Sequence, residues 1–178
     1  MGYWVYTSNV DGQFQKSGFS ETCINECHGS IHHMQCMNDC RSKIWSAQGF
    51  IPEVDEAQCR LRNALPQCEV CNRLARPNIL MFGDGDWNPA RQQAQQTRQD
   101  SWLKSVAEHK AKITVIEIGA GTAVPSVRFF TQQLIRHFAA RLIRINVRES
   151  AVVNSQDVAL PLAAKQALLQ INGSIKAA

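Results

Sequence analysis

Residues 113–126 read ITVIEIGAGTAVPS, and this stretch indicates the fold class. Residues 113–118 are rich in β-branched side chains and have the length of a strand, which ends at the glycines that follow. Residues 124–140 are then predicted to form a helix. Backbone amides in such a strand-to-helix turn can bind a phosphate or ribose, but a tight turn without any ligand selects the same residues.

The segments on either side repeat this alternation. Strands are predicted at 3–7, 79–82 and 142–145, and helices from Asn88 and Pro89 to about Lys110 and over 160–171. Such alternation indicates an α/β fold with a parallel sheet that binds ligands at the carboxyl ends of its strands. The glutamine-rich run 92–99 is predicted to lie on the exposed side of its helix.

Composition excludes several classes of protein. The chain has 178 residues, 44% hydrophobic and 19% charged, which is ordinary globular usage. Its longest apolar runs are of strand length, far short of the roughly 20 residues of a membrane span. Residues 1–100 carry nine basic and eleven acidic groups, and 101–178 carry ten and four. We expect a solvated arginine face without a nucleic-acid platform, formed by Arg128, Arg136, Arg141, Arg144 and Arg148.

Two cysteine pairs have the spacing of a zinc site. Cys36 and Cys40 are separated by three residues, Cys68 and Cys71 by two, and such pairs can close tetrahedrally around one ion. A zinc ion with four thiolates has no open position, so it would stabilise structure. The alternative is four unrelated buried thiols. The cysteines outside these pairs are Cys23, Cys27 and Cys59, and the possible substitute ligands are His32 and His33.

Residues 1–11 show no basic segment followed by an apolar one, so we expect no secretion signal. A cytoplasmic location is therefore predicted. Thiols are kept reduced in that compartment, which favours metal binding over disulfides for the seven cysteines.

His28 is the candidate base. It lies in the sequence ECHG at 26–29, downstream of a polar turn that holds Asn9 and Asp11. A histidine can accept a proton near neutral pH. A lone histidine is more often structural, so the order of the surrounding motifs decides its interpretation.

That order resembles the sirtuin family of NAD-dependent protein deacylases. The sequence TSNVD at 7–11 is similar to the family's Thr-Gln-Asn-Ile-Asp, and ECHG at 26–29 is similar to Glu-Leu-His-Gly. Two cysteine pairs follow, as in the family. LARP at 74–77 and FGD at 82–84 then look like Leu-Arg-Pro and Phe-Gly-Glu.

The resemblance continues through the second half of the chain. GAG at 119–121 stands where the family has Gly-Thr-Ser, and IN at 145–146 matches the Ile-Asn pair that holds the adenosine. The ordered set spans nearly all 178 residues. Ser8, Asp84 and the pair Ala120–Gly121 depart from the family pattern, which leaves the acyl group and the protein substrate open.

The resemblance implies a reaction as well as a fold. The carbonyl oxygen of an acylated lysine would attack the nicotinamide ribose of NAD, and nicotinamide would leave. His28 would deprotonate a ribose hydroxyl, so that the acyl group passes to ADP-ribose. The implied catalytic residues are His28, Asn9 and Asp11; the cofactor-binding residues are Thr7, Ser8, Asn9, Asp11, Gly119, Ala120, Gly121, Asn146 and Val147; the peptide-binding residues are Phe82, Gly83 and Asp84; and the zinc ligands are Cys36, Cys40, Cys68 and Cys71.

The family's first strand and its Gly-Ala-Gly-Ile-Ser loop have no counterpart here. The resemblance therefore implies an incomplete Rossmann-like parallel sheet, at 1–27 and 78–178, with an inserted small zinc-binding module at 28–77. We expect weak NAD binding, impaired deacylation and self-association through the incomplete sheet. An NAD hydrolase of the same superfamily and a non-catalytic zinc-stabilised binding module are the alternatives.

Overall fold

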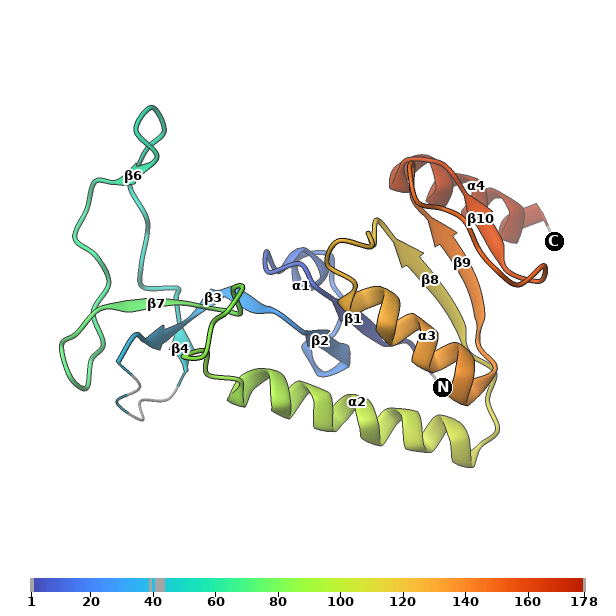
Figure 1. The fold of residues 1–178 in the computed structure, drawn as a ribbon, viewed down its shortest axis with the longest axis horizontal. Coiled ribbons are helices and arrows are strands. Elements are labelled where there is room, and N and C mark those ends of the chain that lie inside the picture. The colour runs from blue at the N-terminus through green and yellow to red at the C-terminus, as the bar shows by residue number, and fades with distance from the viewer. Residues whose placement is uncertain (1, 39, 41–43, 178) are drawn as a thin grey trace. The chain divides into compact units, whose positions relative to one another are not determined.

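The structure is a computed structural model that describes residues 2–38, 40 and 44–177 (Figure 1). The chain divides into two compact units, Met1–Trp102 and Leu103–Ala178. The sheets of the first unit are formed by β1 to β7, and the sheet of the second unit by β8 to β10. Among the described residues, none of the helices combines the length and the apolar character needed to cross a membrane.

The first unit begins with a two-stranded parallel sheet. The strand β1 (Val5–Thr7) lies beside β2 (Ile24–Glu26), and Thr7 is paired with Glu26. The chain between them forms the short helix α1 (Gln13–Lys16) and a 3-10 turn at Glu21–Cys23. The strand predicted at 3–7 is confirmed. The second strand is too short and too polar to be recognised from its sequence.

An antiparallel sheet follows, in which β3 (Gly29–Cys36) is central. It pairs with β4 (Trp45–Ser46) on one side and with β7 (Ala75–Ile79) on the other. A separate small ribbon is formed by β5 (Val54–Asp55) and β6 (Arg60–Leu61). Strand β3 was not predicted from the sequence, because its partner β7 is distant in the chain and leaves no local signal.

The strand predicted at 79–82 is also displaced, since β7 ends at Ile79. Met81 and Phe82 lie beyond it and are exposed, so the apolar run is not part of a core. Pro77 is tolerated within β7 because the register with β3 shifts between Ser30 and Met34.

Helix α2 (Ala90–Glu108) confirms the helix predicted after Asn88 and Pro89. The side-chain oxygen of Asn88 accepts a hydrogen bond from the amide of Ala90 at 3.1 Å. This explains the polar residues before the helix as a cap.

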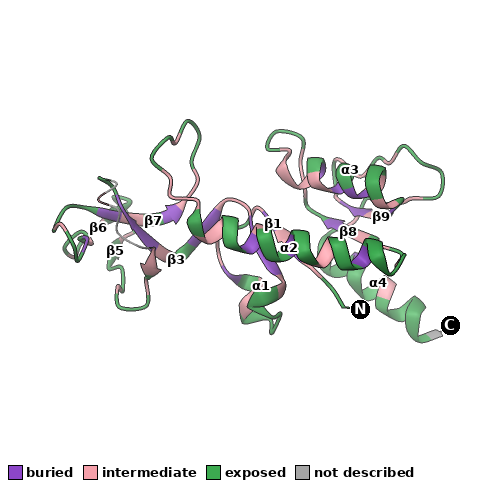
Figure 2. Ribbon diagram, turned by 90° about the horizontal axis from the view of Figure 1, so that it is seen from below, coloured by how far each residue is buried: buried purple, intermediate pink, exposed green. Residues whose placement is uncertain are grey.

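The glutamines of α2 do not all lie on an exposed side, which corrects that expectation. Figure 2 shows buried residues along a mostly exposed helix, and Gln95 and Gln99 are among the buried side chains. The amide of Asn25 donates to Gln99 at 2.8 Å, and the amide nitrogen of Glu26 donates to Gln95 at 3.0 Å. Buried amides need partners, and here helix and strand supply them to each other.

Gln99→Leu is expected to lower the free energy of unfolding by about 1–2 kcal/mol, because it removes an acceptor from the buried Asn25 amide. Urea unfolding measures this change. Gln93→Leu, at an exposed position of the same helix, is the matched control. Equal stability of the two variants would contradict the role given to Gln99.

The second unit contains a three-stranded parallel sheet in the order β10-β9-β8. The strands are β8 (Thr114–Ile118), β9 (Arg141–Ile145) and β10 (Val158–Leu160). Helix α3 (Ser126–Phe138) connects β8 to β9, and α4 (Ala164–Ala177) follows β10. These parallel strands and helices confirm the predicted α/β class.

The helix predicted over 160–171 begins too early. Leu160 belongs to β10, and α4 starts only at Ala164. Pro161 follows Leu160 directly, and a residue before proline disfavours the helical conformation.

Two of the arginines expected on a solvated face are buried. Arg128 of α3 and Arg144 of β9 each keep only 9% of their surface exposed. Both approach Glu117 of β8, which is almost completely buried. A buried charge requires a partner of opposite sign, and Glu117 supplies it.

Candidate functional site

The parallel pair β1 and β2 brings two predicted site segments to one edge of its sheet. The turn at 8–11 follows β1, and residues 27–28 follow β2. The amide of Cys27 donates to the carbonyl of Thr7 at 2.9 Å, so the two segments are joined at their start. The carboxyl edge of a parallel sheet is where α/β folds bind ligands.

The turn that carries Asn9 and Asp11 has a fixed backbone. The amide of Asn9 donates to the hydroxyl of Thr7 at 3.1 Å, and the carboxylate of Asp11 accepts from the amide of Gln13 at 3.2 Å. Gly12 then adopts a positive φ of 66°, which favours glycine. Strand β1, the turn and helix α1 are thereby connected in a defined geometry.

Strand β3 holds the same turn from the other side. The amide of Ile31 donates to the carbonyl of Val10 at 2.9 Å, and Nε2 of His32 lies 3.0 Å from the carbonyl oxygen of Asp11. Since a carbonyl oxygen only accepts, His32 is the donor. A Cβ on Gly12 would lie 2.7 Å from the His32 ring, so a larger residue there would displace this contact.

His28 lies between β2 and β3, and its carbonyl accepts a hydrogen bond from the amide of Leu80 at 2.9 Å. Gly29 has a φ of 81°, and a Cβ there would lie 2.0 Å from the carbonyl oxygen of Asn78. Only glycine permits this approach of β7 to the segment that carries His28. Burial lowers the pKa of His28 below its usual value of 6.5, so the imidazole is neutral and can accept a proton at neutral pH.

This lowered pKa predicts the acid limb of the activity profile. A reaction that uses neutral His28 as base should keep its rate down to pH 6.5 and lose it only as the pH falls through the lowered pKa of this partly buried ring. A pH profile of kcat/KM measures the midpoint. A midpoint above pH 6.5 would contradict the assignment of the acid limb to His28.

Glu26 lies two residues before His28 and is anchored by helix α2. Its carboxylate is buried and forms an ion pair with Arg91, and the side-chain amide of Gln95 donates to it at 3.3 Å. The helix therefore holds the end of β2, and with it the start of the segment that contains His28.

The residues expected to bind the peptide lie in an exposed loop after β7. Phe82 is 93% exposed, whereas the carboxylate of Asp84 is nearly buried and lies 2.8 Å from Arg76 of β7. The hydrogen bond from Arg76 lowers the pKa of Asp84, which keeps it ionised. The loop is thus fixed at its base, and Phe82 is presented at the surface.

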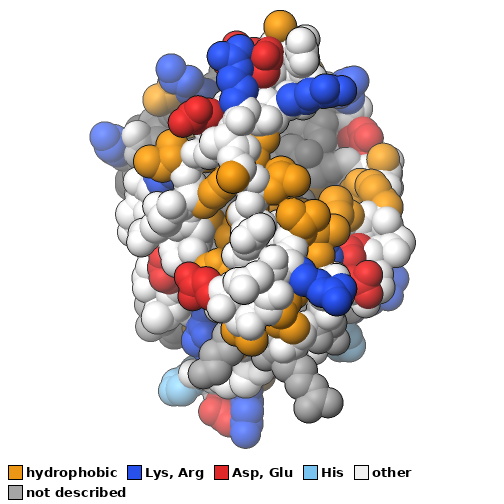
Figure 3. All heavy atoms as spheres, turned by 90° about the vertical axis from the view of Figure 1, so that its left-hand side faces the viewer, with side chains coloured by type: hydrophobic (Ala, Val, Ile, Leu, Met, Phe, Trp, Pro, Cys, Tyr) orange, Lys and Arg blue, Asp and Glu red, His pale blue; other side chains and the backbone are white. Residues whose placement is uncertain are grey.

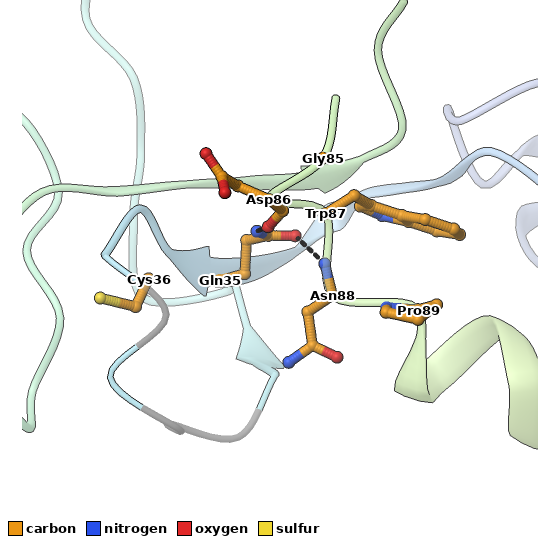
Figure 4. A pocket seen from close by; sticks show the side chains of 7 residues that line it. All are labelled: Gln35, Cys36, Gly85, Asp86, Trp87, Asn88 and Pro89. Atoms are coloured by element: carbon orange, nitrogen blue, oxygen red, sulfur yellow. Dashed lines mark hydrogen bonds between the residues drawn. The ribbon is translucent and has the colours of Figure 1, made fainter. Parts of the chain in front are cut away.

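A polar pocket of about 240 Å³ lies beside this loop, lined by Gln35, Cys36 and residues 85–89 (Figure 4). The Gln35 side chain donates to the carbonyl of Asp86 at 2.8 Å and accepts from the amide of Asn88 at 3.1 Å. Gln35 is itself buried on β3. It therefore attaches the loop before α2 to the strand that ends at Cys36.

The four predicted zinc ligands form one cluster. The sulfurs of Cys36, Cys40, Cys68 and Cys71 lie within 4.8 Å of one another. The Cys36–Cys71 and Cys40–Cys68 sulfur distances are both 3.5 Å. Sulfurs placed tetrahedrally 2.3 Å from zinc are about 3.8 Å apart, so the cluster fits one zinc ion.

The backbone around these cysteines forms a tight knuckle. The amide of Cys68 donates to the carbonyl of Arg73 at 2.7 Å, and the amide of Asn72 donates to the carbonyl of Cys68 at 2.8 Å. Asn72 takes a φ of 57° at this turn. Among the described residues, the group that could hold a metal includes neither His32 nor His33, the substitute ligands considered from the sequence.

The rest of this region has little core of its own. Figure 3 shows hydrophobic side chains gathered among polar ones on the side of the molecule where Figure 1 labels β4, β6 and β7. A region that exposes so much apolar surface needs an additional constraint, which a zinc ion provides. The exposed hydrophobic residues between β3 and β7 are Met37, Ile51, Val54, Leu65, Val70 and Leu74.

In the second unit, the turn at 119–121 and the loop after β9 come together. Gly119 has a φ of 68°, and its amide donates to the carbonyl of Ile145 at 2.9 Å. The side-chain amide of Asn146 donates to the carbonyl of Ala120 at 3.1 Å. A Cβ on Gly119 would meet nothing within 4 Å, so the space beside this residue is open.

Comparisons with known proteins show where this arrangement recurs. The profile described as Sir2 family matches residues 1–106, which include the Asn9 turn, His28, the cysteine cluster and the 82–84 loop. The chain belongs to the Sir2 family. The predicted sirtuin resemblance is therefore confirmed.

Individual curated proteins align with most of this chain. A probable bifunctional ADP-ribose hydrolase/ADP-ribosyltransferase of Fusarium oxysporum f. sp. cubense is 28% identical over 160 residues, 84% of this chain and 26% of that protein. An NAD-dependent protein deacylase 2 of Pyrobaculum aerophilum is 27% identical over 173 residues, 97% of this chain and 59% of that protein. The chain thus spans between about a quarter and three fifths of the length of these curated relatives.

A solved Sir2-family structure shares the fold. Sir2Tm bound to a propionylated peptide superposes with a TM-score of 0.64 at 19% identity, over 98% of this chain and 65% of that one. At this identity the likeness establishes the fold alone.

The structure brings the predicted Sir2 residues together in two groups, one in each unit. One sheet edge of the first unit carries Asn9, Asp11 and His28. In the second unit, hydrogen bonds to backbone carbonyls hold the turn of Gly119 beside Asn146. Thr7 and Ser8 lie with the first group, and Gly121 with the second; Val147 is 64% exposed in the loop after β9. Their roles stay predictions.

Sequence reasoning missed the residues that hold these segments in place. His32, Gln35 and Arg76 each attach a site loop to a strand. Their partners are between 8 and 51 residues away. Signals were available for two of them: His32 lies close to His28 but was interpreted as a substitute zinc ligand, and Arg76 lies in the LARP sequence but was given no contact.

Proposed function

We propose that this chain carries the catalytic segment of a Sir2-family NAD-dependent protein deacylase, which transfers an acyl group from a lysine side chain to ADP-ribose. The observation that supports this most strongly is the common sheet edge at which the Asn9 and Asp11 turn meets the segment of His28. An amide, a carboxylate and a neutral imidazole are thereby held near one another by backbone contacts. The Pyrobaculum aerophilum deacylase, similar over 97% of this chain, supports the same activity.

The side chains divide the work by their chemistry. The side chains of Asn9 and Asp11 offer an amide and a carboxylate that can orient the carboxamide of nicotinamide. A ring nitrogen of His28 takes up the proton of a ribose hydroxyl, because burial keeps the imidazole neutral. NAD, when bound, supplies the nicotinamide leaving group and the ribose hydroxyl that receives the acyl group.

The loop at 82–84 would receive the acylated peptide. Its base is fixed by the ion pair of Asp84 with Arg76, and Phe82 is exposed above it. Backbone groups of an extended loop can pair with a substrate peptide as an added strand, while side-chain contacts select the residues that flank the lysine. The partners are therefore NAD and a protein with an acylated lysine.

Transfer of ADP-ribose to a different acceptor is the second candidate activity. The Fusarium relative, described as a probable ADP-ribose hydrolase/ADP-ribosyltransferase, supports it. The same Asn9 turn and His28 would serve an acceptor such as water or a protein side chain. The proposal also includes self-association of the chain and a cytoplasmic location.

Nicotinamide release distinguishes these activities. With the chain in excess over peptide, we expect nicotinamide to be released from NAD when the peptide carries an acetyl-lysine. We expect no release when the same peptide carries an unmodified lysine. Release that is independent of the peptide would favour NAD hydrolysis, and a labelled protein product would favour ADP-ribosyl transfer. Absence of release with every acceptor would contradict all of these activities.

A further inference from the structure

Two buried arginines lie beneath the loops that follow β8 and β9. The side chains of Arg128 and Arg144 are each 10% exposed, and that of Glu117 is 1% exposed. Nε of Arg128 lies 3.6 Å from the Glu117 carboxylate, and Arg144 donates to the same oxygen. Burying two guanidinium groups against one carboxylate is costly unless their remaining N–H groups find acceptors.

Those acceptors are backbone carbonyls of the two loops and, for Arg128, also the carboxylate of Glu149 at 3.4 Å. Arg128 donates to the carbonyl of Ala120 through Nε at 3.0 Å and Nη2 at 2.8 Å, and to that of Glu149 at 2.6 Å. Arg144 donates to the carbonyl of Ala151. One guanidinium thus connects the turn after β8 to the loop after β9.

The orientation of these carbonyls fixes the orientation of the next amides. Among the described residues all peptide bonds are trans, and in a trans peptide the C=O and the following N–H point in opposite directions. Carbonyls of Ala120, Glu149 and Ala151 that face the arginines therefore direct the N–H groups of Gly121, Ser150 and Val152 away from them.

We infer that Arg128 and Arg144 are positioning residues, which hold these three peptides so that their N–H groups serve as donors to the ribose and phosphate oxygens of a nucleotide. The inference rests on the proposed function for the nature of the ligand. The arginines only donate, so they use loop carbonyls and leave loop amides available to a ligand. Gly121, Ser150 and Val152 are each partly exposed to solvent, which permits the approach.

Asn146 holds the same two loops with both ends of its side-chain amide. Its Oδ1 accepts from the amides of Arg148 and Glu149, both at 2.9 Å, while its Nδ2 donates to the carbonyl of Ala120. The side chain expected to contact adenosine is therefore used to shape the loop, and its contribution to binding passes through the backbone.

Lysine cannot replace arginine here. The planar guanidinium places several N–H groups at fixed angles, whereas an ammonium group is a point charge that cannot span two loops in the same geometry. Arg128→Lys keeps the positive charge beside Glu117, so folding should be preserved while the loop carbonyls lose their shared donor. Arg136→Lys, on an exposed position of the same helix, is the matched control.

Calorimetric titration of the full chain with ADP-ribose tests the inference. Arg128→Lys is expected to weaken binding by about ten-fold or more, and Arg136→Lys by less than about two-fold, with unfolding midpoints unchanged in both. Hydrogen exchange should also accelerate in residues 119–124 and 146–152 of Arg128→Lys, while β8 and β9 stay protected.

Each outcome is decisive. Unchanged ADP-ribose affinity in Arg128→Lys would overturn the inference alone, whereas an unaltered chain that does not bind ADP-ribose would overturn the proposed function and the inference with it. If Arg128→Lys does not fold, Arg144→Lys carries the same test through the carbonyl of Ala151, and unchanged affinity in that variant would overturn the inference.

Discussion

His28→Ala is expected to lower the rate of acyl-peptide-dependent nicotinamide release and acyl transfer by about 100-fold or more, because it removes the base from the shared sheet edge. Burial favours the neutral imidazole, which can accept a proton, and the alanine side chain has no group that can do so. Steady-state kinetics with NAD and an acetyl-lysine peptide measure the loss.

His137→Ala is the matched control, because this histidine is exposed on α3. Its rate should equal that of the unaltered chain. Zinc content and unfolding midpoint of His28→Ala should also be unchanged, since the contact of residue 28 with Leu80 uses the backbone carbonyl. A His28→Ala variant with full activity would remove the assignment.

Loss of zinc is expected to have the largest effect on stability. A Cys68→Ala/Cys71→Ala variant should retain well under one zinc per chain and lose the ordered structure around β4 to β6. The exposed apolar residues of this region show that packing alone contributes little there. Metal analysis and limited proteolysis measure the two effects.

Cys59→Ala provides the control, because Cys59 is exposed and does not belong to the cluster. It should bind one zinc ion and resist proteolysis as the unaltered chain does. Normal folding of the double variant without metal would show that the four cysteines are ordinary thiols.

Local sequence patterns predicted the elements that depend on local chemistry. The β-branched run before Gly119 and the Asn88 cap were sufficient for β8 and α2, because period and capping act within a few residues. The cysteine pairs predicted a cluster for the same reason, since each pair closes on a short turn.

Features that depend on distant partners could not be predicted. Gln99 is buried because Asn25 needs an acceptor, and Arg128 is buried because Glu117 and the carbonyl of Ala120 receive its N–H groups. Polar residues at such positions look solvent-exposed in the sequence. Strand β3 was missed likewise, because its polar residues show no alternation and its partner β7 comes after the cysteines.

The identity of the product tests most directly whether this chain transfers the acyl group from lysine to ADP-ribose. Mass spectrometry of the reaction with NAD and a peptide whose lysine carries an isotope-labelled acetyl group follows the acyl group itself. The account predicts one labelled acetyl-ADP-ribose for each nicotinamide released, and none in His28→Ala. Nicotinamide release accompanied only by unlabelled ADP-ribose, with the peptide still acetylated, would contradict it.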